Sequence, residues 1–104
     1  MKRRLFLLAW ALTVPAHAHT PMLDCRMEGR EIVCTPGFSD GTPAPGMTVQ
    51  VYSYADELLQ KAQADSQSRV KFQRPPGDFY IRFDPGHESP AEFDHADLLG
   101  SVDI

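Results

Sequence analysis

The chain contains 104 residues with a formal net charge of −4, and 42% of them are hydrophobic. This length corresponds to one small domain, whose thin core gains from a covalent cross-link. The excess of Asp and Glu over Lys and Arg argues against a nucleic acid or an anionic membrane surface as a partner.

The first eighteen residues have the pattern of a secretory signal peptide. A basic start (Lys-Arg-Arg) precedes an apolar run at residues 5–14 that is too short to span a bilayer, and Ala-His-Ala then matches a cleavage site. We therefore predict a signal peptide at residues 1–18 and a single exported, periplasmic domain at residues 19–104, with a flexible N-terminus and an acidic C-terminal tail. Cleavage after Ala16 is the alternative. No later segment is apolar enough to predict a membrane span in the mature chain.

Two cysteines, Cys25 and Cys34, flank the segment RMEGREIV. This segment predicts two strands joined at residues 28–31, and such a hairpin places the two cysteines opposite each other. In an oxidising compartment we expect them to form a structural disulfide bond. A metal-binding thiolate pair and a redox pair are the alternatives, but the spacing is longer than C-x-x-C and the chain has no further cysteine.

Alternating hydrophobic residues predict further strands, separated by turns rich in Pro and Gly. In MTVQVYSY, residues 47–54, two valines alternate with polar and tyrosine side chains, and residues 70–73 and 79–84 repeat the alternation. Residues 35–46 and 74–78 carry the turn chemistry. Strands at such short intervals predict an all-β fold, a small β-sandwich.

One segment, residues 53–67, fits two structures. Its residues favour a helix, with Ser53 and Asp56 as an N-cap pattern and the apolar side chains on one face. Because strands are predicted on both sides, the same residues also fit an edge strand at residues 58–62 that follows a turn at residues 55–57. From the residues alone, both structures remain open.

Three motifs carry a resemblance to a known family. They are DGTPAPGMTVQVY at residues 40–52, ADSQSRVKF at residues 64–72 and PPGDFYIRFDPGH at residues 75–87. In this order they resemble the carboxypeptidase-regulatory-like, transthyretin-like β-sandwich modules, in which Ser68 would stand at a position usually held by glycine. The resemblance implies a transthyretin-like (Ig-like) sandwich, a hairpin at residues 58–62 and a scaffolding or binding role.

A narrower resemblance concerns the C-terminal motif DPGHESPAEFDHADL, residues 84–98. Its Gly-His turn after a strand is similar to that of small exported domains associated with bacterial nickel uptake. This similarity implies handling of a divalent metal ion, Ni or Cu, and a transport system or an outer-membrane receptor component as the partner.

The N-terminal histidines are candidate metal ligands. After cleavage behind Ala18, His19 becomes the first residue, and its amine and imidazole can chelate a divalent ion. Cleavage behind Ala16 instead leaves His17-Ala18-His19, which can offer Cu(II) or Ni(II) a square-planar site. The alternative is a terminus without any ligand role, since chain termini are commonly disordered.

Two further histidines lie beside carboxylates near the C-terminus. His87 precedes Glu88, and His95 follows Asp94. If the strand at residues 91–98 forms, His95 and Asp94 lie on opposite faces of it. A site built from both histidines with Glu88 and Asp94 as oxygen ligands suits Ni, Cu or Zn. A solvated acidic turn without metal is the alternative.

The tyrosines at positions 52, 54 and 80 are predicted on outward faces of the strands. Tyrosine is enriched at interfaces, so Tyr52, Tyr54 and Tyr80 form a candidate interaction face for a protein or a glycan. Their alternative role is to cover the small core.

Catalytic motifs such as G-x-S-x-G, H-E-x-x-H and a glycine-rich phosphate loop do not occur, and we expect no enzyme. The sequence predicts a non-enzymatic periplasmic binding or accessory module that handles Ni or Cu for uptake. The alternative is a protein-interaction or carbohydrate-binding module that uses the exposed tyrosine face, and a purely structural partner of a transport complex is a third hypothesis.

Overall fold

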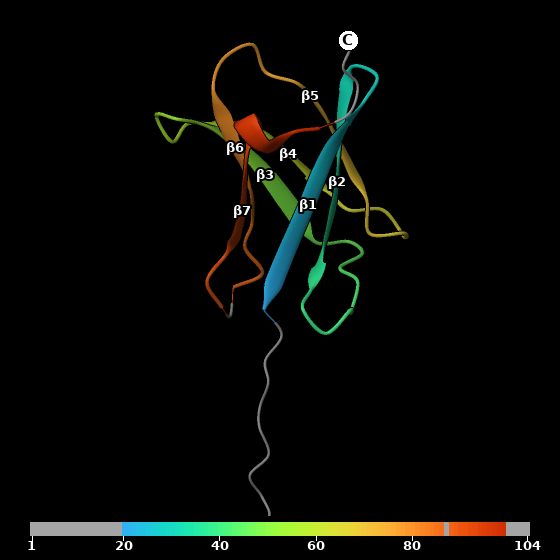
Figure 1. Cartoon of the computed structure of the whole chain (residues 1–104). Coiled ribbons are helices and arrows are strands. Elements are labelled where there is room, and N and C mark those ends of the chain that lie inside the picture. The colour runs from blue at the N-terminus through green and yellow to red at the C-terminus, as the bar shows by residue number, and fades with distance from the viewer. Residues whose placement is uncertain (1–19, 87, 100–104) are drawn as a thin grey trace, which may run out of the picture.

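The computed structural model describes residues 20–86 and 88–99. This part of the chain forms seven strands and one short 3-10 helix (Figure 1). Their bounds are β1 Pro21–Glu28, β2 Glu31–Phe38, β3 Thr48–Ser53, β4 Leu58–Gln63, β5 Val70–Gln73, β6 Phe79–Phe83, β7 Ala91–Asp94 and η2 His95–Asp97.

The strands form two antiparallel sheets that pack as a sandwich. One sheet has the order β1-β2-β5 and the other has the order β4-β3-β6-β7. Figure 1 shows β1 crossing in front of the four-stranded sheet, and β1 lies next to β7 at one side of the sandwich. The predicted all-β sandwich is confirmed.

The core lies between the sheets and follows the alternation of the sequence. Val49 and Val51 of β3 and Phe79, Ile81 and Phe83 of β6 are fully buried. Their neighbours along each strand point outward, because successive side chains of a strand lie on opposite faces. Burial of these five side chains contributes on the order of 10 kcal/mol of hydrophobic stabilisation before the entropy cost of folding.

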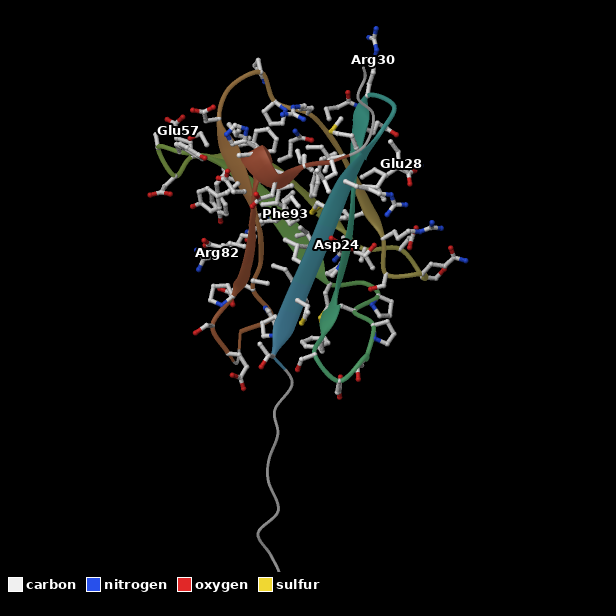
Figure 2. All side chains as sticks on the ribbon, in the orientation of Figure 1. Asp24, Glu28, Arg30, Glu57, Arg82 and Phe93 are labelled. Carbon is white, nitrogen blue, oxygen red and sulfur yellow. A yellow bond between two sulfur atoms is a disulfide. The ribbon has the colours of Figure 1, made fainter. Side chains whose placement is uncertain are left out.

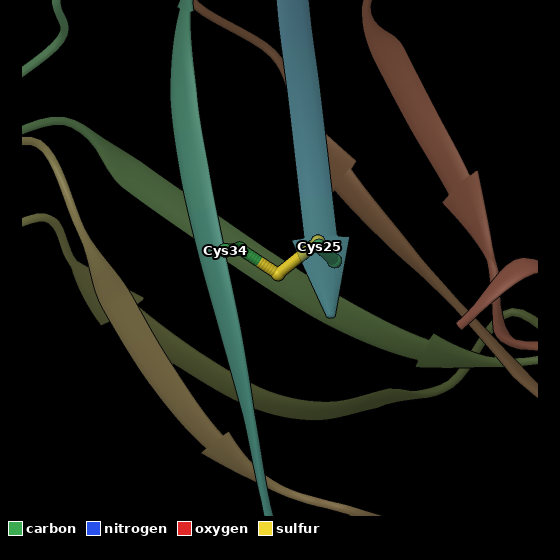
Figure 3. The surroundings of a disulfide bond; sticks show 2 residues. All are labelled: Cys25 and Cys34. Carbon is green, nitrogen blue, oxygen red and sulfur yellow. A yellow bond between two sulfur atoms is a disulfide. The ribbon is translucent and has the colours of Figure 1, made fainter. Parts of the chain in front are cut away.

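The β1–β2 hairpin carries the predicted disulfide bond, which Figure 3 shows between the two strands. A two-residue loop begins at Gly29, whose φ of 63° suits the first position of a type II′ turn. The resulting register places Cys25 opposite Cys34, with their Cα atoms 4.0 Å apart. The Met27 N–H donates to the Leu99 carbonyl and so points away from β2, which makes Met27 and Ile32 a pair without main-chain hydrogen bonds between them. Such pairs recur at every second position of an antiparallel ladder, so Cys25 and Cys34, two positions further along, form another closely spaced pair of this kind.

Residues 58–63 form strand β4, so the strand alternative is confirmed and the helix is excluded. A turn reverses the chain between Ser53 and Glu57: the Ser53 N–H donates to the Glu57 carbonyl and the Asp56 N–H donates to the Ser53 carbonyl, both at 2.9 Å. The Ser53 hydroxyl accepts hydrogen bonds from the N–H groups of Ala55 and Glu57, and Asp56 takes a left-handed φ of 65°. This local bonding and the pairing of β4 with β3 outweigh the helix propensity of the segment.

Ser68 also has a left-handed backbone, with φ of 65°, although it is buried. Its hydroxyl accepts a hydrogen bond from the Ala44 N–H at 2.8 Å and donates one to the Pro36 carbonyl at 2.7 Å. A side chain in this conformation costs about 1 kcal/mol relative to glycine. The two hydrogen bonds explain why serine is accommodated here.

The last strand is shorter than the 91–98 span considered from the sequence. It ends at Asp94, whose carboxylate accepts a hydrogen bond from the Ala96 N–H at 2.9 Å and caps the 3-10 helix. His95 is therefore the first residue of η2, so the expectation that His95 and Asp94 lie on opposite faces of one strand is wrong. Within residues 20–86 and 88–99, no helix has the extent and apolar character required to cross a membrane.

Candidate interaction face

The outer face of the four-stranded sheet holds a row of four residues, one from each strand. The register pairs Tyr52 with Leu58 on one side and with Tyr80 on the other, and it pairs Tyr80 with Asp94. We call this set, together with Tyr54, which directly follows β3, the tyrosine face. Leu58 and Tyr54 are 49% and 54% exposed, so an apolar and an aromatic side chain stand open to solvent at its margin.

Tyr52 and Tyr80 are stacked at the centre of the tyrosine face. Their ring centroids lie 5.5 Å apart with an interplanar angle of 20°. The Tyr80 hydroxyl donates a hydrogen bond to the Asp56 carboxylate at 2.7 Å, and this bond raises the pKa of Tyr80. The stack and the hydrogen bond hold the ring in one orientation, which lowers the entropy lost when a partner binds.

Tyr54 is held by Asp94, which ends the edge strand β7. Its hydroxyl donates to the Asp94 carboxylate at 2.5 Å, a contact between residues forty positions apart in sequence. This hydrogen bond, with smaller effects of partial burial and of the charges on Asp94, Asp78 and Asp97, raises the pKa of Tyr54 to about 12. The same bond, together with the Ala96 N–H, lowers the pKa of Asp94.

A charged row borders the tyrosine face on the same outer surface. Lys61, Gln50, Arg82 and Glu92 lie opposite one another across the four strands. Arg82 forms ion pairs with Glu92 at 3.3 Å and with Asp84 at 3.5 Å, and Figure 2 shows its side chain pointing away from β1. An aromatic centre with a polar border is the usual anatomy of a protein interface.

His95 lies at one end of the tyrosine face, and within residues 20–86 and 88–99 it belongs to no group of three or more side chains that could hold a metal ion. Its Nε2 atom is 3.3 Å from the Asp78 carboxylate, and its ring contacts Phe79 and Tyr54 with centroid distances of 5.2 and 5.6 Å. About a fifth of the side chain, 21%, is exposed. These contacts attach η2 to the β5–β6 loop and to the β3–β4 turn.

The structure does not bring the described metal candidates together. Glu88 lies in the β6–β7 loop, whereas Asp94 and His95 lie at the other end of β7, a strand about 10 Å long (Figure 1). The predicted ligands His19 and His87 are outside the described residues. Within the described part of the chain, no group of three or more His, Cys, Asp or Glu side chains could hold a metal ion.

Sequence reasoning found the three tyrosines but missed the carboxylates that position them. The sequence pattern places Asp56 in a turn or a helix cap, and it places Asp94 in a metal site or in a solvated acidic turn. Local patterning gave no signal for either contact, because both depend on which strands are neighbours. The Tyr52–Tyr80 contact depends on the antiparallel pairing of β3 with β6. Two other strands lie between β3 and β6 in the sequence, so local patterning does not show that these strands are neighbours.

Chemically, the tyrosine face offers aromatic surface, hydroxyl groups and carboxylates, which suit binding. The two cysteines of the chain form the disulfide bond, so neither is a free nucleophile. Comparison of the chain with protein-family models, with curated proteins and with solved structures found no match.

Proposed function

We propose that the chain is an exported, non-enzymatic binding module that docks a protein partner through the tyrosine face. The signal-peptide pattern of residues 1–18 supports a periplasmic location, and the two-sheet sandwich is compatible with the transthyretin-like family that the sequence motifs resemble. Binding modules of this kind use a rigid sandwich as a scaffold for one surface.

The observation that carries the proposal is the Tyr52–Tyr80 stack between exposed Leu58 and the Asp94-bound Tyr54. Aromatic side chains that stand on an outer sheet face do not contribute to the core between the sheets. Here their orientation is fixed by carboxylates on two other segments, Asp56 and Asp94. Fixed aromatic side chains at the centre of a polar border commonly supply most of the free energy of protein association.

The geometry favours a protein over a glycan as the partner. Sugar rings bind by lying flat on an exposed aromatic face, whereas Tyr52 and Tyr80 turn one face each toward the other ring. The hydroxyls of Tyr54 and Tyr80 already donate to carboxylates of the chain itself. What remains for a partner is the ring edges, the Leu58 side chain and the charged row, which suit a mixed apolar and polar protein surface.

Site-specific photo-crosslinking in the producing cell tests the proposal. A photoreactive amino acid at position 58 lies in the row beside Tyr52, and the same amino acid at position 30 lies at the tip of the β1–β2 hairpin in the other sheet. We expect position 58 to yield a discrete cross-linked protein and position 30 to yield none of that product. The Tyr52→Ala change should weaken binding of the identified partner by about thirtyfold, the effect of one interface hot spot.

Three outcomes would contradict the proposal. They are equal cross-linking from positions 58 and 30, retained affinity in Tyr52→Ala, and tyrosine-dependent binding of oligosaccharides without any protein partner. The last outcome would establish the carbohydrate-binding alternative.

Handling of Ni or Cu stays a prediction from the sequence, carried by His19 and His87 with His95, Glu88 and Asp94. Native mass spectrometry of the protein recovered from the periplasm, with and without Ni(II) and Cu(II), tests it and also reports the start site. One retained metal ion that a His87→Ala/His95→Ala variant loses would support it. Absence of a specific adduct at micromolar metal would refute it.

A further inference from the structure

We propose a second binding site on the other sheet: a trough along the end of β2 that takes a short extended segment of a protein partner, with an apolar side chain and a Lys or Arg two residues apart. The trough has a volume of about 590 Å³, within the range of ligand-binding pockets. It lies on the three-stranded sheet, so it is independent of the tyrosine face.

Small residues form the floor of the trough. On the outer face of this sheet the register pairs Met22 with Gly37 and Asp24 with Thr35. Gly37 has no side chain and Thr35 has a short one, whereas Met22 is 53% exposed beside them. The β1 side chains therefore stand as one wall above a low floor on β2.

The opposite wall consists of the β2–β3 loop and the β4–β5 loop, and hydrogen bonds hold both loops against β2. The Phe38 N–H donates to the Thr42 carbonyl at 2.9 Å, and the Ser68 hydroxyl donates to the Pro36 carbonyl at 2.7 Å. These loops occupy the side of β2 that β5 leaves free, since the pairing of β5 with β2 ends at Cys34. Because both walls are attached to the floor, the trough is formed before any ligand binds.

The charge at the trough indicates the chemistry of the ligand. Asp24 is the only ionisable residue among those that line it, and no described residue forms an ion pair with Asp24. Two bases lie close in sequence to lining residues: Arg26, two residues after Asp24 on the same outer face of β1, forms an ion pair with Glu28, and Arg69 donates a hydrogen bond to the Gln67 side chain at 2.5 Å. Because Arg26 is engaged by Glu28, the Asp24 carboxylate is left to complement a cation placed over it.

The spacing of the rows matches an extended peptide. The Met22–Gly37 row and the Asp24–Thr35 row are two residues apart along the strands, a distance of about 6.6 Å. Side chains at positions i and i+2 of an extended segment have the same spacing and point to the same side. An apolar side chain over Gly37 thus places a Lys or Arg at position i+2 beside Asp24.

Two matched peptides test this inference: acetyl-Ala-Val-Ala-Lys-Ala-amide and the same peptide with Glu in place of Lys. Each is titrated into the ¹⁵N-labelled full chain, and amide chemical shifts are followed by NMR. We expect the Lys peptide to shift the amides of Thr35, Gly37 and Thr42 in a saturable manner. It should bind at least about threefold more tightly than the Glu peptide, the size of one exposed ion pair.

Variants locate the contact. Asp24→Asn should remove the difference between the two peptides, whereas Glu31→Gln, at the hairpin end of β2 and beyond the trough, should leave it unchanged. Thr35→Arg should block the floor and abolish binding by both peptides. The inference is overturned by the absence of shifts at millimolar peptide, by equal affinity of the two peptides, or by shifts that centre on the tyrosine face.

Discussion

Two pairs of residues in this small sandwich lie directly opposite each other on neighbouring antiparallel strands, but one pair faces the core and the other faces solvent. Cys25 and Cys34 lie opposite each other in the three-stranded sheet, and Tyr52 and Tyr80 lie opposite each other in the four-stranded sheet. The cysteines point into the core, where they are at most 4% exposed, whereas the tyrosines point to the outer surface. The face of the sheet therefore decides whether a directly opposed pair holds the fold or is available to a partner.

The largest expected effect comes from opening the inward pair. In the Cys25→Ala/Cys34→Ala variant the unfolded chain regains the freedom of the closed hairpin, and the free energy of unfolding should fall by about 3 kcal/mol. Chemical denaturation of the oxidised wild type and the variant measures this change. The outward pair should remain stacked, so ring-current shifts around Tyr52 and Tyr80 should be unchanged in the folded variant. Loss of these ring-current shifts would mean that the Tyr52–Tyr80 stack depends on the disulfide bond in the other sheet.

Two left-handed residues extend the comparison between inside and outside. Ser68 and Asp56 both have φ of 65°, but Ser68 is buried and its hydroxyl connects two loops to each other, whereas Asp56 is exposed and holds Tyr80. Ser68→Ala leaves a buried N–H and a buried carbonyl without these partners, so we expect a loss of about 2 kcal/mol in unfolding free energy. Ser68→Gly should lose about 1 kcal/mol less, because glycine adopts this φ without strain. Equal losses in denaturant unfolding of the two variants would contradict the role assigned to φ.

The sequence predicted those parts of the fold that depend on local patterning. Alternation identified the buried side chains of β3 and β6, and the spacing of Cys25 and Cys34 identified their hairpin and its disulfide bond. For residues 58–63 helix propensity and strand context conflicted, and pairing with β3 decided the outcome. Helix propensities differ by only a few tenths of a kcal/mol per residue, so strand pairing can override them.

The candidate site was predictable only in part, because its contacts join distant segments. The outward direction of the tyrosines followed from alternation. The Tyr54–Asp94 bond spans forty residues, and the capping of η2 by Asp94 turned His95 away from the strand on which it was considered. No local pattern encodes which carboxylate meets which hydroxyl, since sheet order determines it.

The outward pair should matter little for stability and much for binding. Tyr52→Ala removes one ring of the stack, and we expect the free energy of unfolding to fall by no more than about 1 kcal/mol, the size of a cross-strand aromatic pair. Thermal and denaturant unfolding measure this loss, with Tyr52→Phe as the matched control that keeps the stack. A loss as large as that of the disulfide variant would assign the tyrosines to the fold and remove the main argument for an interaction face.

The smallest effect at neutral pH, and the most specific one, concerns the Tyr54–Asp94 hydrogen bond. The pKa of Tyr54 is raised to about 12, above its ordinary value of 10.0, so folding favours the neutral hydroxyl. The stabilisation from this bond is therefore complete below about pH 10 and is lost as the pH rises through about 12. Tyr54→Phe should remove the tyrosine that ionises last in a titration of phenolate absorbance.

The acid side of the same bond gives an independent check. The pKa of Asp94 is lowered from 3.8, first by the Tyr54 hydroxyl and then by the Ala96 N–H, so its contribution is complete above that value and is lost as the pH falls. In Tyr54→Phe the pKa of Asp94 should rise but stay below 3.8, because the Ala96 N–H still donates to it. NMR titration of the Asp94 carboxyl measures this change, and Tyr80→Phe is the control that should leave it in place. An unchanged Asp94 titration in Tyr54→Phe would show that the hydroxyl does not hold this carboxylate, and Tyr54 would then be a freely rotating part of the face.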